Sequence, residues 1–70
     1  MRPGALVKNR FEREIAMYEE IHSIAVAWFL PSEFGMIVDH GFSNVGTPYF
    51  RILASSGNLG WVRCEKVRSI

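Results

Sequence analysis

YFRILASSGNLGWVRC, residues 49–64, is the most informative stretch of this 70-residue chain. It contains two runs rich in aromatic and β-branched residues, which favour strands. The polar segment SSGN lies between them, and its Gly57–Asn58 pair is typical of tight hairpin turns. Residues 49–64 therefore predict a β-hairpin.

The two faces of this hairpin differ, because side chains alternate along a strand. We expect the core to receive Phe50, Ile52, Ala54, Val62 and Cys64. The opposite face then carries Tyr49, Arg51, Leu53, Trp61 and Arg63. Aromatic rings and cations share this second face, so it is where we expect a partner to bind.

Other segments also predict strands. Val67 and Ile70 are three residues apart, which suits one helical turn that leads into a short final strand. Upstream, we expect a first strand at Ala5–Lys8, a buried strand at Ile24–Leu30 that ends at Pro31, and a further strand at Met36–Asp39. His40, Gly41 and the residues that follow predict a loop. Several short strands with turns between them indicate a small all-β barrel.

Residues 10–21 allow two interpretations. Apolar and aromatic residues recur at helical spacing, at Phe11, Ile15, Tyr18 and His22. Asn9 and Glu12 resemble a capping box, so one short helix is one possibility. The other is an extended arm of a long loop, because tertiary packing often overrides local propensity. Both interpretations remain open at this point.

Length and composition suggest one folded domain over residues 1–70. The chain is 49% hydrophobic and 21% charged, as in ordinary globular proteins. Its longest apolar run, Ile24–Leu30, is too short to cross a bilayer, and no signal peptide opens the sequence. The single cysteine excludes an internal disulfide. We expect a soluble protein without membrane contact, cytoplasmic or virion-associated rather than secreted.

Charge is distributed unevenly, although the net charge is only +1. Both ends are basic, whereas residues 11–48 carry six acids against Arg13 alone. If the first and last strands are neighbours, the terminal cations would form one patch: Arg2, Lys8 and Arg10 from one end, and Arg63, Lys66 and Arg68 from the other. With Tyr49 or Trp61 beside it, such a patch could bind single-stranded nucleic acid. A pI of about 8.0 is less basic than a dedicated nucleic-acid binder usually has.

Four segments resemble, in order, the landmarks of Src-homology-3-type (SH3-like) barrels. They are AMYEE at 16–20, LPSEFGMIV at 30–38, YFRILASSGNLGWV at 49–62 and VRSI at 67–70. The opening RPGALVK and the GWV step also resemble short uncharacterised SH3-like proteins of tailed phages and marine metagenomes. The resemblance covers residues 16–70 and implies a five-stranded SH3-like (Sm-like) barrel. A shared fold does not by itself imply a shared function.

The same resemblance suggests a binding surface. Tyr18 matches the first tyrosine of the family's opening motif, Tyr49 its aromatic pair, and Trp61 the aromatic after the glycine. These three rings would line one groove. Glu20 replaces a family tyrosine, and Arg63 and Lys66 replace the proline and tyrosine of the closing turn. The groove therefore lacks part of the aromatic wall that proline-rich peptides need. The expected binding surface is Tyr18, Tyr49, Trp61, Arg63 and Lys66.

Catalytic and metal chemistry have little support in the sequence. The candidate metal ligands His22, Asp39, His40 and Cys64 show none of the compact spacings of metal sites. Cys64 lies on the expected inward face, where a thiol acts as a small apolar side chain. Neither Ser55 nor Ser56 has a histidine nearby in sequence. We therefore expect a protein that is not an enzyme and has no cofactor.

The remaining functions are binding and assembly. An exposed strand edge can extend a sheet across a second copy, and an acidic middle facing basic ends favours head-to-tail contact. The chain also has more aromatic residues than a small core needs, and surplus aromatics often mark interfaces. The sequence therefore favours a non-enzymatic module that binds a protein partner or itself as a homo-oligomer. Nucleic-acid binding through the terminal cations is the alternative.

Overall fold

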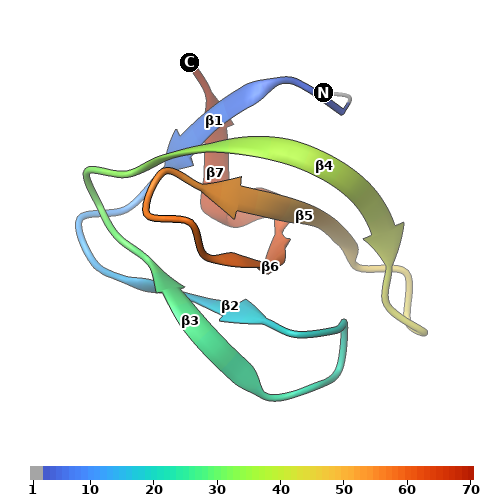
Figure 1. Ribbon diagram of the computed structural model, residues 1–70. Helices are drawn as coiled ribbons and strands as arrows, with labels where there is room; N and C mark the ends of the chain where they lie inside the picture. Colours follow the sequence, from blue (N-terminus) through green and yellow to red (C-terminus); the bar gives the residue numbers. More distant parts are fainter. Residues whose placement is uncertain (1–2) are drawn as a thin grey trace.

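The computed structural model describes residues 3–70 as one antiparallel sheet. Its elements are β1 (Leu6–Asn9), β2 (Ile15–Tyr18), β3 (Ala25–Phe29), β4 (Phe34–Phe42), β5 (Pro48–Ala54), β6 (Leu59–Arg63), the 3₁₀ turn η1 (Cys64–Lys66) and β7 (Val67–Ser69). The strands lie in the order β3-β2-β6-β5-β4-β1-β7, and neighbours are antiparallel (Figure 1). The sheet is strongly curved but not closed, so β3 and β7 are its two edges.

The predicted hairpin and all-β class are confirmed. β5 and β6 pair from Tyr49 with Arg63 to Leu53 with Leu59, on either side of a turn at the predicted residues. A single turn and a final strand follow the hairpin in the expected order, but the turn η1 precedes the Val67–Ile70 pair that predicted it, and Val67 begins β7. Of the expected core residues, Phe50, Ile52, Ala54 and Val62 are buried, and Cys64 is partly buried. A period of two identifies these four core residues, but it fails at Tyr49, which was expected on the outer face and is buried beside Phe50.

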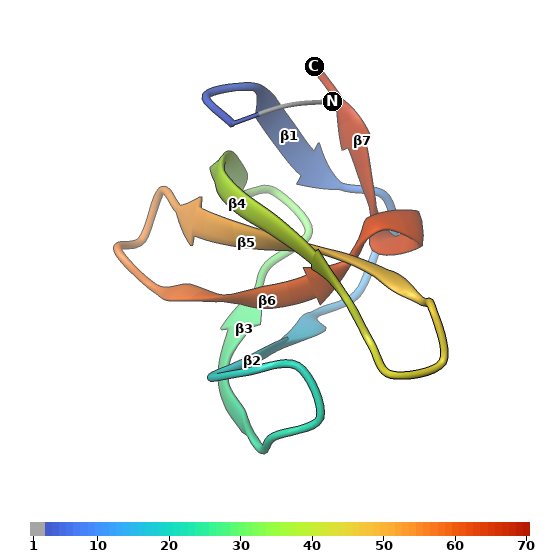
Figure 2. The same ribbon diagram turned by 90° about the vertical axis from the view of Figure 1, so that its right-hand side faces the viewer.

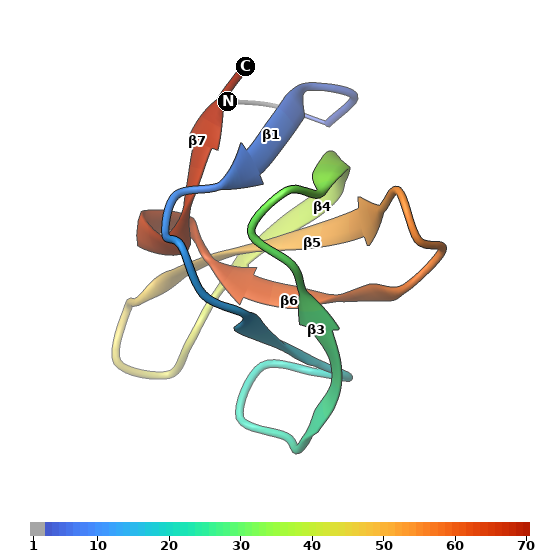
Figure 3. The same cartoon turned by 90° about the vertical axis from the view of Figure 1, so that its left-hand side faces the viewer.

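Residues 10–21 contain no helix, and the sheet has seven strands rather than five. β2 and β3 form an additional hairpin, which lies apart from the β1–β7 pair in all three views (Figures 1, 2 and 3). Ile15 and Met17 are buried, and Ala16 between them is only partly buried, which is the alternation of a strand. The helical spacing of apolar residues was misleading, because the burial of Ile15 and Met17 determines that this segment is a strand.

Asn9 holds the loop that precedes β2 in a non-helical shape. Its buried side chain accepts a hydrogen bond from the Phe11 amide at 2.7 Å. Its Nδ2 atom donates to the carbonyl oxygens of Arg13 at 2.8 Å and Phe29 at 3.0 Å. Asn9 thus bonds to a turn and to the end of β3 instead of capping a helix.

Two further expectations for the strands are corrected. Ile24–Leu30 was predicted to be buried, but β3 is an edge strand, and within it only Phe29 is buried. A continuous apolar run does not reveal whether both of its faces are covered. The strand predicted at Met36–Asp39 extends to Phe42, with a bulge between Ile37 and Asp39. Pairing with β5 extends this strand through His40 and Gly41, which were expected to lie in a loop.

Gly60 is where β6 approaches β2 most closely. A Cβ atom at this position would lie 2.8 Å from the Met17 Cβ and 3.1 Å from the Tyr18 carbonyl oxygen. Backbone atoms are among the neighbours, so the space cannot be opened by moving a flexible side chain. We expect Gly60→Ala to lower the free energy of unfolding by about 1–3 kcal/mol, the usual cost of overpacking. Urea denaturation followed by tryptophan fluorescence measures this loss.

Gly41→Ala is the matched control for this substitution. Its added Cβ would meet first the Ile21 Cδ1 atom at 3.2 Å, which is the movable end of a side chain. We expect a clearly smaller loss of stability than for Gly60→Ala. Equal losses for the two variants would contradict the view that β2 and β6 are held together by close backbone approach.

Glu33 links the turn before β4 to the turn between β5 and β6. Its Oε1 accepts a hydrogen bond from the Leu30 amide at 3.0 Å, and its Oε2 accepts from the Ser56 amide at 3.1 Å and from the Ser55 hydroxyl at 3.5 Å. Burial by itself would raise the pKa of this carboxyl. The hydrogen bonds to its charged form outweigh burial, so the pKa lies below its ordinary value.

This lowered pKa predicts a pH-dependent contribution to stability. A carboxyl with a lower pKa in the folded state stabilises the fold above its unfolded pKa, and the benefit is lost as the pH falls through the folded pKa. We expect Glu33→Gln to cost about 1–2 kcal/mol at neutral pH, the worth of charge-assisted hydrogen bonds. The difference from wild type should shrink steadily as the pH is lowered from about 5. Thermal unfolding across this pH range tests it, with exposed Glu12→Gln as the control. A gap that is constant with pH would refute the assignment.

Candidate functional site

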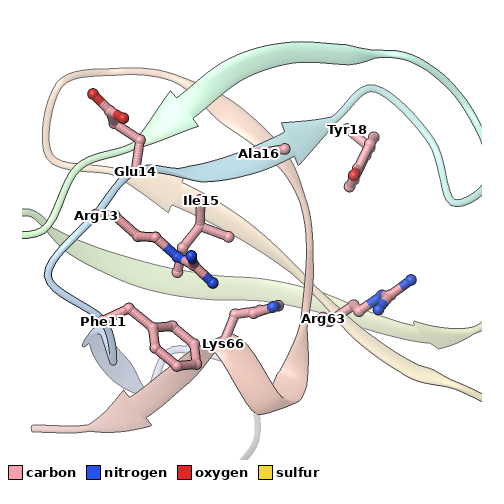
Figure 4. Close-up of a pocket in the computed structure, with 8 residues that line it drawn as sticks. All are labelled: Phe11, Arg13, Glu14, Ile15, Ala16, Tyr18, Arg63 and Lys66. Atoms are coloured by element: carbon pink, nitrogen blue, oxygen red, sulfur yellow. The ribbon is translucent and has the colours of Figure 1, made fainter.

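A cationic groove lies between β2 and β6. The two strands are paired only at Tyr18 and Trp61, and no further pair joins them toward Ile15 and Arg63. The groove lies on that side of the pair and has a volume of about 310 Å³. Its lining consists of Phe11, Arg13, Glu14, Ile15, Ala16, Tyr18, Arg63 and Lys66 (Figure 4). We call this set of residues the β2–β6 groove.

Two of the groove's cations contact the ring of Phe11. The Arg13 Cζ atom lies 5.8 Å from the centre of the Phe11 ring, and the Lys66 Nζ atom lies 5.2 Å from it. Both distances are within the range of cation–π attraction, which is worth about 0.5–1 kcal/mol at exposed positions. Phe11 and Arg13 come from the β1–β2 loop, whereas Lys66 comes from η1 (Figure 4). The ring therefore holds together charges that are more than fifty residues apart.

Arg63 is the third cation of the groove and is anchored by Tyr49. Its Nε atom donates a hydrogen bond to the Tyr49 hydroxyl at 3.4 Å, and this contact is the main reason that the pKa of Arg63 lies above its ordinary value. Its Nη1 atom lies 3.8 Å from a Glu65 carboxylate oxygen. Both side chains of that ion pair are more than half exposed, so water and salt screen it.

The three aromatic residues expected to share one groove line two hollows, although Tyr18 and Trp61 are cross-strand partners. Tyr18 and Tyr49 line a second hollow of about 280 Å³ together with His22, Ser23 and Arg63. Trp61 instead lines a hollow with Glu19, Glu20, Ile21 and Arg51. Ile21 and Trp61 both pack on Gly41, which shows that the β2–β3 loop folds over this tryptophan. Tyr49 is only 7% exposed, and its hydroxyl accepts the hydrogen bond from Arg63.

Sequence reasoning found part of the β2–β6 groove and missed the rest. Tyr18, Arg63 and Lys66 were on the expected binding surface, and all three line the groove. Phe11 and Arg13 are absent from the expected surface, because residues 10–21 allow both a helix and a loop and Arg13 lies in the acidic middle of the chain. The available signal was Phe11 between the two cations Arg10 and Arg13.

The terminal cations are grouped differently from the expected patch. β1 and β7 are paired, which confirms that the first and last strands are neighbours, and Lys8 lies opposite Arg68. The Arg10 amide donates to the Lys66 carbonyl at 2.9 Å, so Arg10 adjoins η1. Arg63 belongs to the β2–β6 groove instead. Arg2 lies outside the described residues.

The edge strand β3 presents an uncharged apolar stripe. Ile24, Val26, Trp28 and Leu30 alternate along the segment and are 71%, 49%, 56% and 43% exposed. Residues 21–32 contain no Asp, Glu, Lys or Arg. β3 pairs only with β2, and Figures 2 and 3 show it at the margin of the fold. We call these four residues the β3 stripe.

Other chemical groups are scattered. Burial raises the pKa of the Cys64 thiol, which lowers the fraction of reactive thiolate at neutral pH. Within residues 3–70, the side chains of His, Cys, Asp and Glu nowhere gather in threes at metal-binding distance. In the same residues, no helix has the length and apolar character that crossing a bilayer requires.

Comparison with known proteins yields no relative: no family model, no curated protein and no solved structure matches this chain.

Proposed function

We propose that this protein is a non-enzymatic assembly module that pairs with a second copy of itself through β3. The observation that carries the proposal is the β3 stripe, because it combines an unpaired strand edge with four exposed apolar side chains. Edge strands present free amide and carbonyl groups that can pair with another chain. Natural proteins protect such edges with charges, prolines or bulges. β3 carries no charge, although it has a bulge at Val26 and Pro31 follows Leu30.

The opposite edge of the sheet illustrates the difference. β7 is only three residues long and carries Arg68 in its middle, two features that discourage pairing with another chain. β3 is five residues long and flanked by the further apolar residues Ile24 and Leu30. Of the two edges, β3 is therefore the one suited to extending the sheet.

β3 can pair with a second copy through its regular part, residues 27–29, whereas a bulge at Val26 interrupts its ladder with β2. We consider two copies of β3 that pair antiparallel about a two-fold axis. When even-numbered residues of one copy face even-numbered residues of the other, the two β3 stripes lie opposite each other. Every cross-strand pair on that face is then apolar with apolar. The four residues are 43–71% exposed, so side-by-side pairing brings their apolar side chains into contact across the two copies.

The same proposal assigns a role to the additional hairpin. β1, β4, β5, β6 and β7 account for the five strands that the SH3-like resemblance implies, and β2–β3 is then an extension of that barrel. The landmarks at 30–38, 49–62 and 67–70 fall on β4, β5–β6 and β7 and support this division, whereas AMYEE at 16–20 falls on β2, in the extension. The extension carries the assembly edge, so partner binding would be a property of β2–β3 rather than of the barrel itself.

Val26→Lys tests the proposal directly. In a dimer, a lysine in the β3 stripe would either lose its hydration or face the same lysine of the second copy. Both outcomes cost free energy, so we expect the variant to be monomeric. Size exclusion with light scattering, over a range from micromolar to millimolar protein, should show a dimer for the wild type. Val45→Lys makes the same exchange at a position that is 82% exposed on the β4–β5 loop, and it should remain dimeric.

The proposal fails if the wild-type protein is monomeric at the highest concentration. It also fails if Val26→Lys associates as strongly as the wild type while both lysine variants retain the wild-type circular dichroism spectrum. Loss of association in Val45→Lys alone would place the interface on the β4–β5 loop instead.

A further inference from the structure

The β2–β6 groove carries an excess of positive charge. Three cations and one acid line it, and Figure 4 shows the Glu14 carboxylate directed away from Arg13, Lys66 and Arg63. Within residues 3–70, neither Arg13 nor Lys66 forms an ion pair. The pair between Arg63 and Glu65 is long and exposed, so an incoming anion can replace Glu65 at little cost.

The cations are also held close together, against their mutual repulsion. Arg13 and Lys66 both lie within 6 Å of the same Phe11 ring. An anion placed between like charges removes their repulsion and gains attraction from both. Phosphate suits this arrangement because guanidinium groups bind its oxygens in a fork and ammonium groups bind them as point charges. The groove is therefore arranged for at least one phosphate group.

The shape of the region favours a linear ligand with more than one unit. The β2–β6 groove and the hollow beside Tyr49 share Tyr18 and Arg63 as a common wall. Their volumes are about 310 and 280 Å³, each near the lower end of the range for small ligand sites. Two adjoining hollows with a cation between them suit a linear ligand in which charged linkages alternate with flat groups.

Aromatic side chains supply the second kind of contact. The half-buried ring of Tyr18 lies at one end of the groove and that of Phe11 at the other (Figure 4). Rings beside a cationic track are the features by which proteins bind single strands, with phosphates on the cations and bases on the rings.

We propose that the β2–β6 groove binds single-stranded nucleic acid, and that it does so independently of pairing through β3. An acidic peptide is the competing ligand, because its carboxylates would also bind the cations. It has no flat groups for the rings, so the aromatic lining favours nucleic acid. The cations that matter are Arg13, Arg63 and Lys66, rather than the terminal pair Lys8 and Arg68.

The test compares two double variants that remove the same charge from different places. Arg13→Gln/Lys66→Gln alters the groove, and Lys8→Gln/Arg68→Gln alters the β1–β7 pair. Binding of a fluorescein-labelled oligothymidylate is followed by fluorescence anisotropy at several salt concentrations. We expect the groove variant to bind at least about tenfold more weakly and its salt slope to fall by about 1.4, or 0.7 for each lost phosphate contact. The terminal variant should lose less than about threefold, from its lower overall charge.

Three further measurements decide between ligands and isolate this site from the assembly interface. An abasic oligonucleotide of the same length should bind at least about fivefold more weakly, because base stacking on aromatic rings is lost. Polyglutamate of matched charge should bind more weakly than oligothymidylate. The monomeric Val26→Lys variant should bind oligothymidylate as the wild type does, so failure of the assembly proposal would leave this result unaffected.

The inference is overturned if the wild-type protein binds no oligothymidylate at low salt. It is overturned equally if the terminal variant loses more affinity than the groove variant, or if the abasic strand or polyglutamate binds as tightly as oligothymidylate. Circular dichroism and thermal unfolding of both double variants verify that each is folded, so that a loss of binding reports on the altered charges.

Discussion

The contact between β2 and β6 is the constraint on which the candidate sites depend. β2 meets the sheet through the single pair of Tyr18 with Trp61, and Gly60 allows Met17 to approach the β6 backbone. Only a residue without a side chain fits at this crossing. Met17 is thereby buried with Phe29 in the shared core, so the β2–β3 hairpin is anchored without a long ladder of hydrogen bonds.

Two consequences follow from this limited pairing. Because β2 is paired with β6 at one position only, a space remains on one side of the pair, and the loop residues Phe11 and Arg13 meet Lys66 there. Because β2 has β3 as its other neighbour, β3 becomes an edge with nothing beyond it. The cationic groove and the apolar edge are thus products of the same hairpin, yet they use different side chains. Self-association and ligand binding can therefore operate separately.

The site residues illustrate what a single sequence can reveal about a surface. Tyr18, Arg63 and Lys66 could be selected from a pattern of aromatic and basic residues, and the structure brings them together. Trp61 was selected on the same grounds, but Ile21 packs beside it from a loop whose path no local pattern predicts. Phe11 and Arg13 were missed because their importance depends on Lys66, which is distant in sequence. Sites assembled from separate loops require the tertiary contacts to be known.

The sequence by itself determined the all-β class, the hairpin of β5 and β6, and the closing turn and strand, because each depends on period-two burial and on turn residues that act locally. Only the tertiary structure decided that residues 10–30 form a second hairpin, that β3 is an exposed edge, and that the sheet has seven strands. These outcomes depend on burial of Ile15, Met17 and Phe29 in a common core and on the hydrogen bonds of Asn9. Helical spacing of apolar residues cannot compete with these long-range contacts.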